Sequence, residues 1–117
     1  MDRKVQLKGK KFLVFGAGLS GTAAAELLLR NGLSVVLYEG NDKQTEAEIR
    51  GKSPLFGNMR IVLGALPEAV IRECEIAVLS PGVPTDLEEV QRMRSMGLAI
   101  WGEIELAYMF EQGKILA

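Results

Sequence analysis

Histidine is absent from this chain of 117 residues, and cysteine occurs once, at Cys74. Without histidine, a Ser-His-Asp triad, a Cys-His catalytic pair and a histidine-ligated zinc site are all excluded. A single cysteine excludes an intrachain disulfide, and its place just before an apolar run predicts a small core residue. Ordinary hydrolase chemistry would therefore need unusual residues here, and we expect no metal site within this sequence.

The sequence also lacks a long apolar run and a surplus of charge. No apolar stretch approaches the roughly 20 residues that a membrane span needs, and no secretory signal precedes the first apolar run. With 14 Lys+Arg against 15 Asp+Glu, the net charge is -1, so we expect no basic surface for nucleic acid or an anionic membrane. These features predict a cytoplasmic globular protein with one modest core and neither a nucleic-acid nor a membrane partner.

Short β-rich apolar runs alternate with longer amphipathic runs, a pattern typical of βαβ units. It predicts an α/β fold: a Rossmann-like, doubly wound parallel sheet of five strands in the order 3-2-1-4-5, with helices on both faces. The strands are expected at residues 11–15, 34–38, 60–63, 75–79 and 98–101. The helices are expected at residues 20–31, at 43–51, from Pro67 onward, from a capping box at 85–88 onward and at 103–111, with a loop at 51–58.

The stretch Gly16-Ala17-Gly18-Leu19-Ser20-Gly21, here called the glycine loop, joins an apolar strand to an Ala/Leu-rich helix. A strand, a G-x-G-x-x-G turn and a helix together form a cradle for nucleotide phosphates. Gly16 permits the turn, Gly18 lets a pyrophosphate approach the backbone, and Gly21 allows the helix to pack close to the strand. The phosphates would lie on unpaired N–H groups at the positive end of the helix dipole. The alternative is a glycine-rich turn that binds no ligand.

Two further segments follow strands of the predicted sheet at the edge where ligands bind in such folds. Glu39 follows the second strand, where an acidic side chain can accept a hydrogen bond from a ribose hydroxyl or a base N–H. The proline loop, Ser80-Pro81-Gly82-Val83-Pro84, follows the fourth strand and would face the glycine loop. Neither loop contains Lys or Arg, so backbone N–H groups and helix dipoles would have to meet any phosphate charge.

The glycine loop, the proline loop and the segment Gly102-Glu103-Ile104-Glu105-Leu106 resemble, in order and spacing, the N-terminal domain of the bacterial Mur ligases. Within that family the resemblance is greatest to the ligases that add D-glutamate to UDP-N-acetylmuramoyl-L-alanine in peptidoglycan synthesis. It implies that residues 1–113 form a UDP-binding domain and that residues 114–117 begin the first strand of a central ATP-binding domain. ATP, Mg²⁺ and D-glutamate would then be bound by other domains, so this chain would bind substrate without catalysing.

The resemblance also implies roles for individual residues. Leu19 and Ser20 would present N–H groups, and Ser20 its hydroxyl, to the diphosphate, while Glu39 would accept a hydrogen bond from the uracil ring. Glu39 stands where the family often has Asp, and Asn41 stands where a basic residue can occur. The expected UDP site comprises ten residues: Gly18, Leu19, Ser20, Gly21, Glu39, Gly40, Asn41, Ser80, Pro81 and Gly82.

Two other interpretations share the glycine loop and the acidic residue. One is an NAD(H)-binding Rossmann regulatory domain, and the other is the cofactor domain of a dehydrogenase. The regulatory domain would not require the proline loop, and a dehydrogenase would need a catalytic base or relay, commonly His, Lys or Tyr, near the crevice. A preference for UDP over NAD would separate the ligase interpretation from both.

Overall fold

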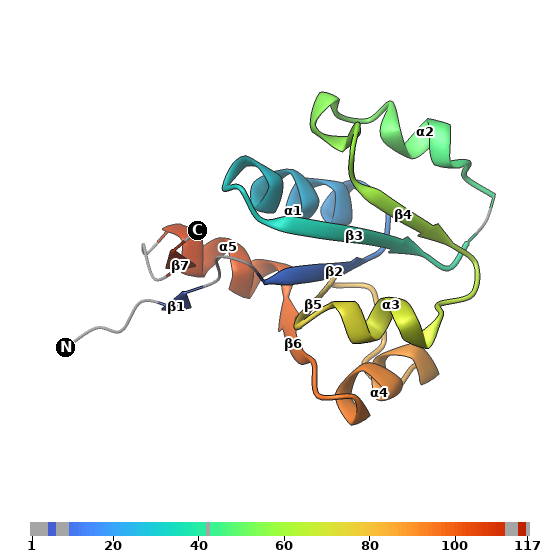
Figure 1. Ribbon diagram of the computed structural model, residues 1–117, viewed down its shortest axis with the longest axis vertical. Helices are drawn as coiled ribbons and strands as arrows, with labels where there is room; N and C mark the ends of the chain where they lie inside the picture. Colours follow the sequence, from blue (N-terminus) through green and yellow to red (C-terminus); the bar gives the residue numbers. More distant parts are fainter. Residues whose placement is uncertain (1–4, 7–9, 42, 112–114, 117) are drawn as a thin grey trace.

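The computed structural model describes residues 5–6, 10–41, 43–111 and 115–116. Its centre is a five-stranded parallel sheet in the order β4-β3-β2-β5-β6 (Figure 1). Numbered along the chain from the first strand of this sheet, the order is 3-2-1-4-5, which confirms the predicted topology. The strands are β2 (Lys11–Phe15), β3 (Ser34–Glu39), β4 (Arg60–Leu63), β5 (Ile76–Leu79) and β6 (Ala99–Gly102).

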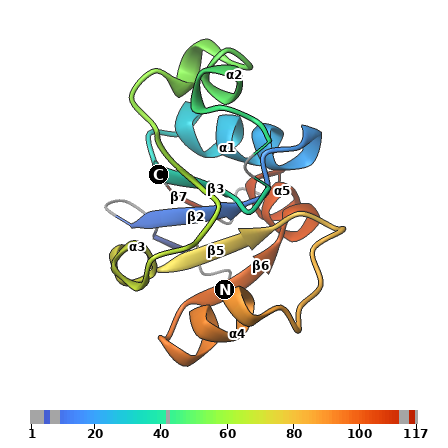
Figure 2. The ribbon, with the colours of Figure 1, turned by 90° about the vertical axis from the view of Figure 1, so that its right-hand side faces the viewer.

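Helices cover both faces of this sheet, as the sequence predicted (Figure 2). Alternate residues of β2 lie on opposite faces of the sheet. Phe12 and Val14 pack into one core, and Leu13 and Phe15 pack into the other. The first core includes residues of α1 (Leu19–Arg30), α2 (Glu46–Arg50), the short 3-10 helix η1 (Pro54–Phe56) and α5 (Glu103–Glu111). The second core includes residues of α3 (Glu68–Glu73) and α4 (Glu88–Ser95).

The central strands are apolar on both sides because helices bury them on both sides. All four residues of β5 are buried. Helix α1 can lie close to the sheet because its inner face carries the small residues Ala24 and Ala25, both buried. It ends before Gly32, whose φ of +76° suits the residue that follows a helix.

The predicted capping box at residues 85–88 is wrong. Helix α4 begins at Glu88, with Leu87 as its N-cap and no side-chain hydrogen bond at that cap. Pro84 starts a turn that delays the helix, and the Leu87 N–H donates to the Pro84 carbonyl at 3.4 Å. A capping box occurs instead at α2, between Thr45 and Glu48. The predicted loop at residues 51–58 contains η1.

Two short strands, β1 (Val5–Gln6) and β7 (Ile115–Leu116), pair in parallel and lie apart from the large sheet (Figure 1). The sequence predicted that a strand begins near residue 114, but not its partner. The predicted domain boundary after residue 113 lies outside the described residues and stays a prediction. Within the described ranges, no helix has the length and apolar character to cross a membrane.

Candidate functional site

The glycine loop carries the chain from the end of β2 into α1. Gly16 has a φ of +111°, which L side chains rarely adopt, and its N–H donates to the Tyr38 carbonyl at 2.7 Å. A Cβ added to Gly21 would lie 1.7 Å from the carbonyl oxygen of Gly16. Glycine is therefore required by the backbone at both positions, whether or not a ligand binds.

Helix α1 begins without a cap. Its N-cap residue is Gly18, which has no side chain to accept a hydrogen bond from the first turn, and that turn contains no acidic residue. By contrast, the first turns of α2, α3, α4 and α5 all carry glutamate. A Cβ added to Gly18 would meet no atom within 4 Å, so the space beside it is open. The start of α1 therefore offers backbone N–H groups and the positive end of a dipole to an anion.

Glu39 ends β3, and its carboxylate joins two loops. Oε1 accepts a hydrogen bond from the Ala17 N–H at 2.8 Å, and Oε2 accepts one from the Asn41 N–H at 2.8 Å. Ala17 belongs to the glycine loop and Asn41 follows β3, so one side chain fixes both segments, a role that the sequence did not predict. A carboxylate can accept about four hydrogen bonds, so it retains acceptor capacity for the expected N–H of a uracil ring.

The proline loop meets the glycine loop through Ser80. Strands β2 and β5 are neighbours, with Phe15 paired to Leu79, and the Ser80 hydroxyl donates to the Phe15 carbonyl at 3.2 Å. A Cβ added to Gly16 would lie 3.1 Å from Ser80 Oγ. The loop then turns back, with the Val83 N–H donating to the Ser80 carbonyl at 3.0 Å. The structure thus brings these two predicted loops together.

All ten residues of the expected site lie at or directly after the carboxyl ends of three adjacent strands, β2, β3 and β5. Gly18, Gly40, Pro81 and Gly82 are exposed, and Leu19 keeps 92% of its surface exposed.

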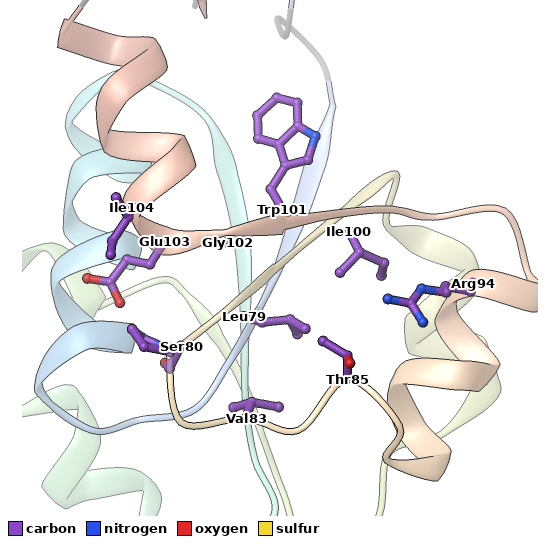
Figure 3. A pocket seen from close by; sticks show the side chains of 11 residues that line it. Leu79, Ser80, Val83, Thr85, Arg94, Ile100, Trp101, Gly102, Glu103 and Ile104 are labelled. Atoms are coloured by element: carbon purple, nitrogen blue, oxygen red, sulfur yellow. The ribbon is translucent and has the colours of Figure 1, made fainter.

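A pocket of about 340 Å³ opens beside the carboxyl ends of β5 and β6 (Figure 3). Arg94 reaches into it from α4, toward Ile100 and Thr85. At the start of α5, Oε2 of Glu103 is buried and accepts no hydrogen bond from the described residues. This pocket shares Ser80 and Pro81 with the expected UDP site, and no residue of the glycine loop lines it.

The sequence missed a cation beside the glycine loop. Lys52 lies between α2 and η1, and its Nζ donates to the Ala17 carbonyl at 2.7 Å and to Oε1 of Gln44 at 2.8 Å. Lys52 and Leu19 also line one surface pocket of about 440 Å³ at the start of α1. Lys52 therefore places a positive charge beside a loop that itself contains no Lys or Arg, and how a phosphate charge would be met stays a prediction. Lys52 is 35 positions from Ala17 in the sequence, and only the fold brings the two together.

Cys74 and Trp101 both pack into the core. Cys74 is buried, as predicted, and burial raises the pKa of its thiol to about 11, so it is a poor nucleophile at neutral pH. Trp101 packs edge-on against Phe12 in the core, with ring centroids 6.2 Å apart. In the ranges that the structure describes, no group of His, Cys, Asp or Glu could hold a metal ion.

A doubly wound parallel sheet, with a glycine loop and an uncapped helix start where the strand order reverses, defines a Rossmann-like α/β domain. The family is given by comparison with known proteins. The model of the family described as "Mur ligase MurD-like, N-terminal domain" matches residues 10–102. The chain therefore belongs to this family of Mur ligase N-terminal domains, which confirms the resemblance seen in its three motifs.

Curated relatives agree with this family. The chain is 47% identical over 109 residues to the UDP-N-acetylmuramoylalanine--D-glutamate ligase of Lachnoclostridium phytofermentans, covering 93% of this chain and 24% of the relative. It is 39% identical over 115 residues to the ligase of the same name from Lachnospira eligens, covering 97% of this chain and 25% of the relative. The chain thus spans about a quarter of the length of the curated relatives it matches.

Among solved structures, the fold is similar to a 3-hydroxyacyl-CoA dehydrogenase from Archaeoglobus fulgidus, with a TM-score of 0.61. The identity is 24%, and the match covers 80% of this chain and 33% of the dehydrogenase. At this level of identity the likeness concerns the fold alone. It confirms the Rossmann-like architecture.

Proposed function

We propose that this chain binds the UDP moiety of UDP-N-acetylmuramoyl-L-alanine, as the N-terminal domain of a ligase that adds D-glutamate in peptidoglycan synthesis. The observation that carries the proposal is the open, uncapped start of α1, which lies beside the proline loop in a member of the MurD-like family. The names of the curated relatives supply the substrate and the amino acid.

The diphosphate would bind at the start of α1. The N–H groups of Leu19 and Ser20, together with the Ser20 hydroxyl, would donate to its oxygens, and Gly18 would allow it to approach the backbone. Gly21 supports this arrangement from behind because it permits the close packing of α1 on the loop. Backbone donors at a helix start suit a diphosphate that is held rather than transferred.

The uracil would lie beyond the end of β3. Glu39 would accept the ring N–H, and Gly40 and Asn41 would border the ring. Ser80, with Pro81 and Gly82, would form the opposite wall. Glu39 is held by two backbone N–H groups, so its carboxylate is already oriented before the base arrives.

The complete ligase would use ATP and Mg²⁺ to convert the substrate carboxylate into an acyl phosphate. The amine of D-glutamate would then attack, with release of phosphate and formation of the amide. These steps would belong to domains outside this chain, with residues 114–117 beginning the central one. The part played by this chain would be to hold the substrate by its UDP end, in the cytoplasm where the nucleotide substrates occur.

An NAD(H)-binding function is less well supported. It accounts for the glycine loop and for the fold shared with the dehydrogenase, but that likeness carries no ligand with it. The curated relatives cited above are ligases that match along nearly the whole chain. The proline loop, which packs on the glycine loop through Ser80, has no role that NAD binding requires.

Isothermal titration of the 117-residue chain with UDP, UDP-N-acetylmuramoyl-L-alanine and NAD tests the proposal. We expect saturable binding of both UDP compounds and no binding of NAD. The Gly18→Ala variant is the matched control: its Cβ fits the fold but occupies the path of the diphosphate, so it should abolish UDP binding. Binding of NAD in preference to UDP would contradict the proposal.

A further inference from the structure

The structure assigns to Lys52 a specific task that rests on the proposed function. We propose that Lys52 supplies the positive charge that recognises the diphosphate, and so makes the site favour UDP over uridine. The proposal does not follow from the glycine motif, because Lys52 lies in a different segment, between α2 and η1.

The position of the Lys52 ammonium group is fixed by two hydrogen bonds. Its Nζ donates to the carbonyl of Ala17, the residue before Gly18, and to Oε1 of Gln44. An ammonium group has three donors, so these two bonds leave one for a ligand. Lys52 and Leu19 line the same pocket, which places the ammonium beside a residue whose N–H is expected to contact the diphosphate.

Lys52 has no carboxylate partner among the described residues. Both of its hydrogen-bond partners are neutral oxygens, and none of the ion pairs among the described residues includes it. Glu26 lines the same pocket but pairs with Arg30 at 3.2 Å. A cation held in place without a carboxylate partner is available to an incoming anion.

The negative charge of Glu39 beside the glycine loop makes a nearby cation important for binding a diphosphate. The carboxylate of Glu39 binds the N–H of Ala17, so a negative charge already lies at the glycine loop. That charge would repel a diphosphate placed at the start of α1. Lys52 binds the carbonyl of the same residue and offsets this repulsion.

The segments before and after Lys52 are both ordered by hydrogen bonds. Before it, helix α2 begins with the capping box of Thr45 and Glu48. Arg50 ties the end of α2 to the following turn through the carbonyls of Phe56 and Met59, each at 2.7 Å. Lys52 therefore belongs to a segment whose backbone is already ordered, so the ligand would not have to order it.

Titration of the 117-residue chain with UDP and with uridine, followed by backbone amide shifts, tests this inference. Lys52→Met keeps the apolar stem and removes the charge. We expect it to weaken UDP binding about tenfold, the loss of one partly exposed charge-assisted hydrogen bond, and to leave uridine binding unchanged within twofold. Lys52→Arg, which keeps the charge, should restore most of the affinity for UDP.

Two controls separate charge from structure. Arg72→Met removes a positive charge from α3, which packs on the opposite face of the sheet, and should leave both affinities unchanged. The tenfold difference between wild type and Lys52→Met should shrink as salt is raised, because the interaction is ionic. A structural effect on the loop would weaken UDP and uridine binding equally, at all salt concentrations.

The outcomes are distinct. Equal weakening of UDP and uridine, or unchanged UDP binding in Lys52→Met, would overturn the role of Lys52 while the proposed function stands. Failure of the wild-type chain to bind UDP at all would refute the proposed function, and this inference with it.

Discussion

Replacing Gly21 with alanine tests the tightest of the positions at which a Cβ could be added to the described glycines. The added Cβ would lie 1.7 Å from the carbonyl oxygen of Gly16 and 2.7 Å from its carbonyl carbon. Real Cβ atoms essentially never come within 3.0 Å of such atoms, so the loop and the helix would have to separate by more than an ångström. Both groups belong to the backbone, and no side-chain rotation can relieve the clash.

The movement would disturb the packing of α1 on β2. Overpacking of a core costs about 1–3 kcal/mol, and a clash between two backbone segments belongs at the upper end, near 3 kcal/mol. That is a large part of the roughly 5–15 kcal/mol that stabilises a small domain. We expect urea unfolding of Gly21→Ala to show a lower midpoint with an unchanged slope.

Gly18→Ala is the matched comparison, because both variants add one methyl group to the same loop. The Cβ at Gly18 would meet nothing within 4 Å, and its φ of -74° is normal for alanine. This variant should have a stability within about 1 kcal/mol of the wild type, because alanine restricts the unfolded chain but is a poorer N-cap residue than glycine. A Gly21→Ala variant as stable as Gly18→Ala would refute the close packing of α1 on the loop.

Three further variants test other parts of the structure. Glu39→Gln should lower the free energy of unfolding in urea by about 1–3 kcal/mol, because its amide NH₂ would face one of the two backbone N–H groups that the carboxylate now accepts. An unchanged unfolding midpoint would contradict the bridging role of Glu39. The unfolded chain releases the Cys74 proton near pH 9 and the folded chain near pH 11, so this thiol should lower stability as pH rises between those values. Its contribution is up to about 1.4 kcal/mol per pH unit, and Cys74→Ala should flatten the measured slope; an identical slope would contradict the burial effect. Thr45→Ala removes the cap of α2 and should cost about 1 kcal/mol in urea unfolding, whereas no loss would show that the cap is not needed.

The five-stranded sheet could be predicted because its signals are local. Each buried strand is a short apolar run, and each connection between consecutive strands has the dozen or so residues that a parallel crossover needs. The bounds of β2, β4 and α5 agree with the prediction, and those of β3, β5 and β6 differ from it by one residue at one or both ends. The strand order follows from the crossover rules once the glycine loop identifies the first strand.

The errors occurred where the sequence pattern allows more than one structure. Both Thr85–Glu88 and Thr45–Glu48 fit the spacing of a capping box, but only the second forms one. The first fails because Pro84 starts a turn that carries the chain past Thr85 before α4 begins. The four-residue pattern does not include the preceding residue, so Pro84 has to be considered together with it.

The sequence predicted the two loops of the candidate site, but not the side-chain contacts that hold the glycine loop in place. The glycine loop and the proline loop carry their own motifs, and their contact follows from the pairing of β2 with β5. The bond of Lys52 to Ala17 depends on how α2 and η1 fold back over the first core, which no motif encodes. The bridging role of Glu39 likewise depends on the side chain turning back toward the loop after β2.

The central claim is that the start of α1 and the two loops beside it bind UDP. It is tested most directly by recording backbone amide shifts of the isotope-labelled chain during titration with UDP and, separately, with NAD. The account predicts saturable shifts with UDP at residues 18–21, 39–41 and 80–82, and none with NAD. Saturable shifts with NAD at these residues, or UDP shifts confined to the pocket around Arg94, would contradict it.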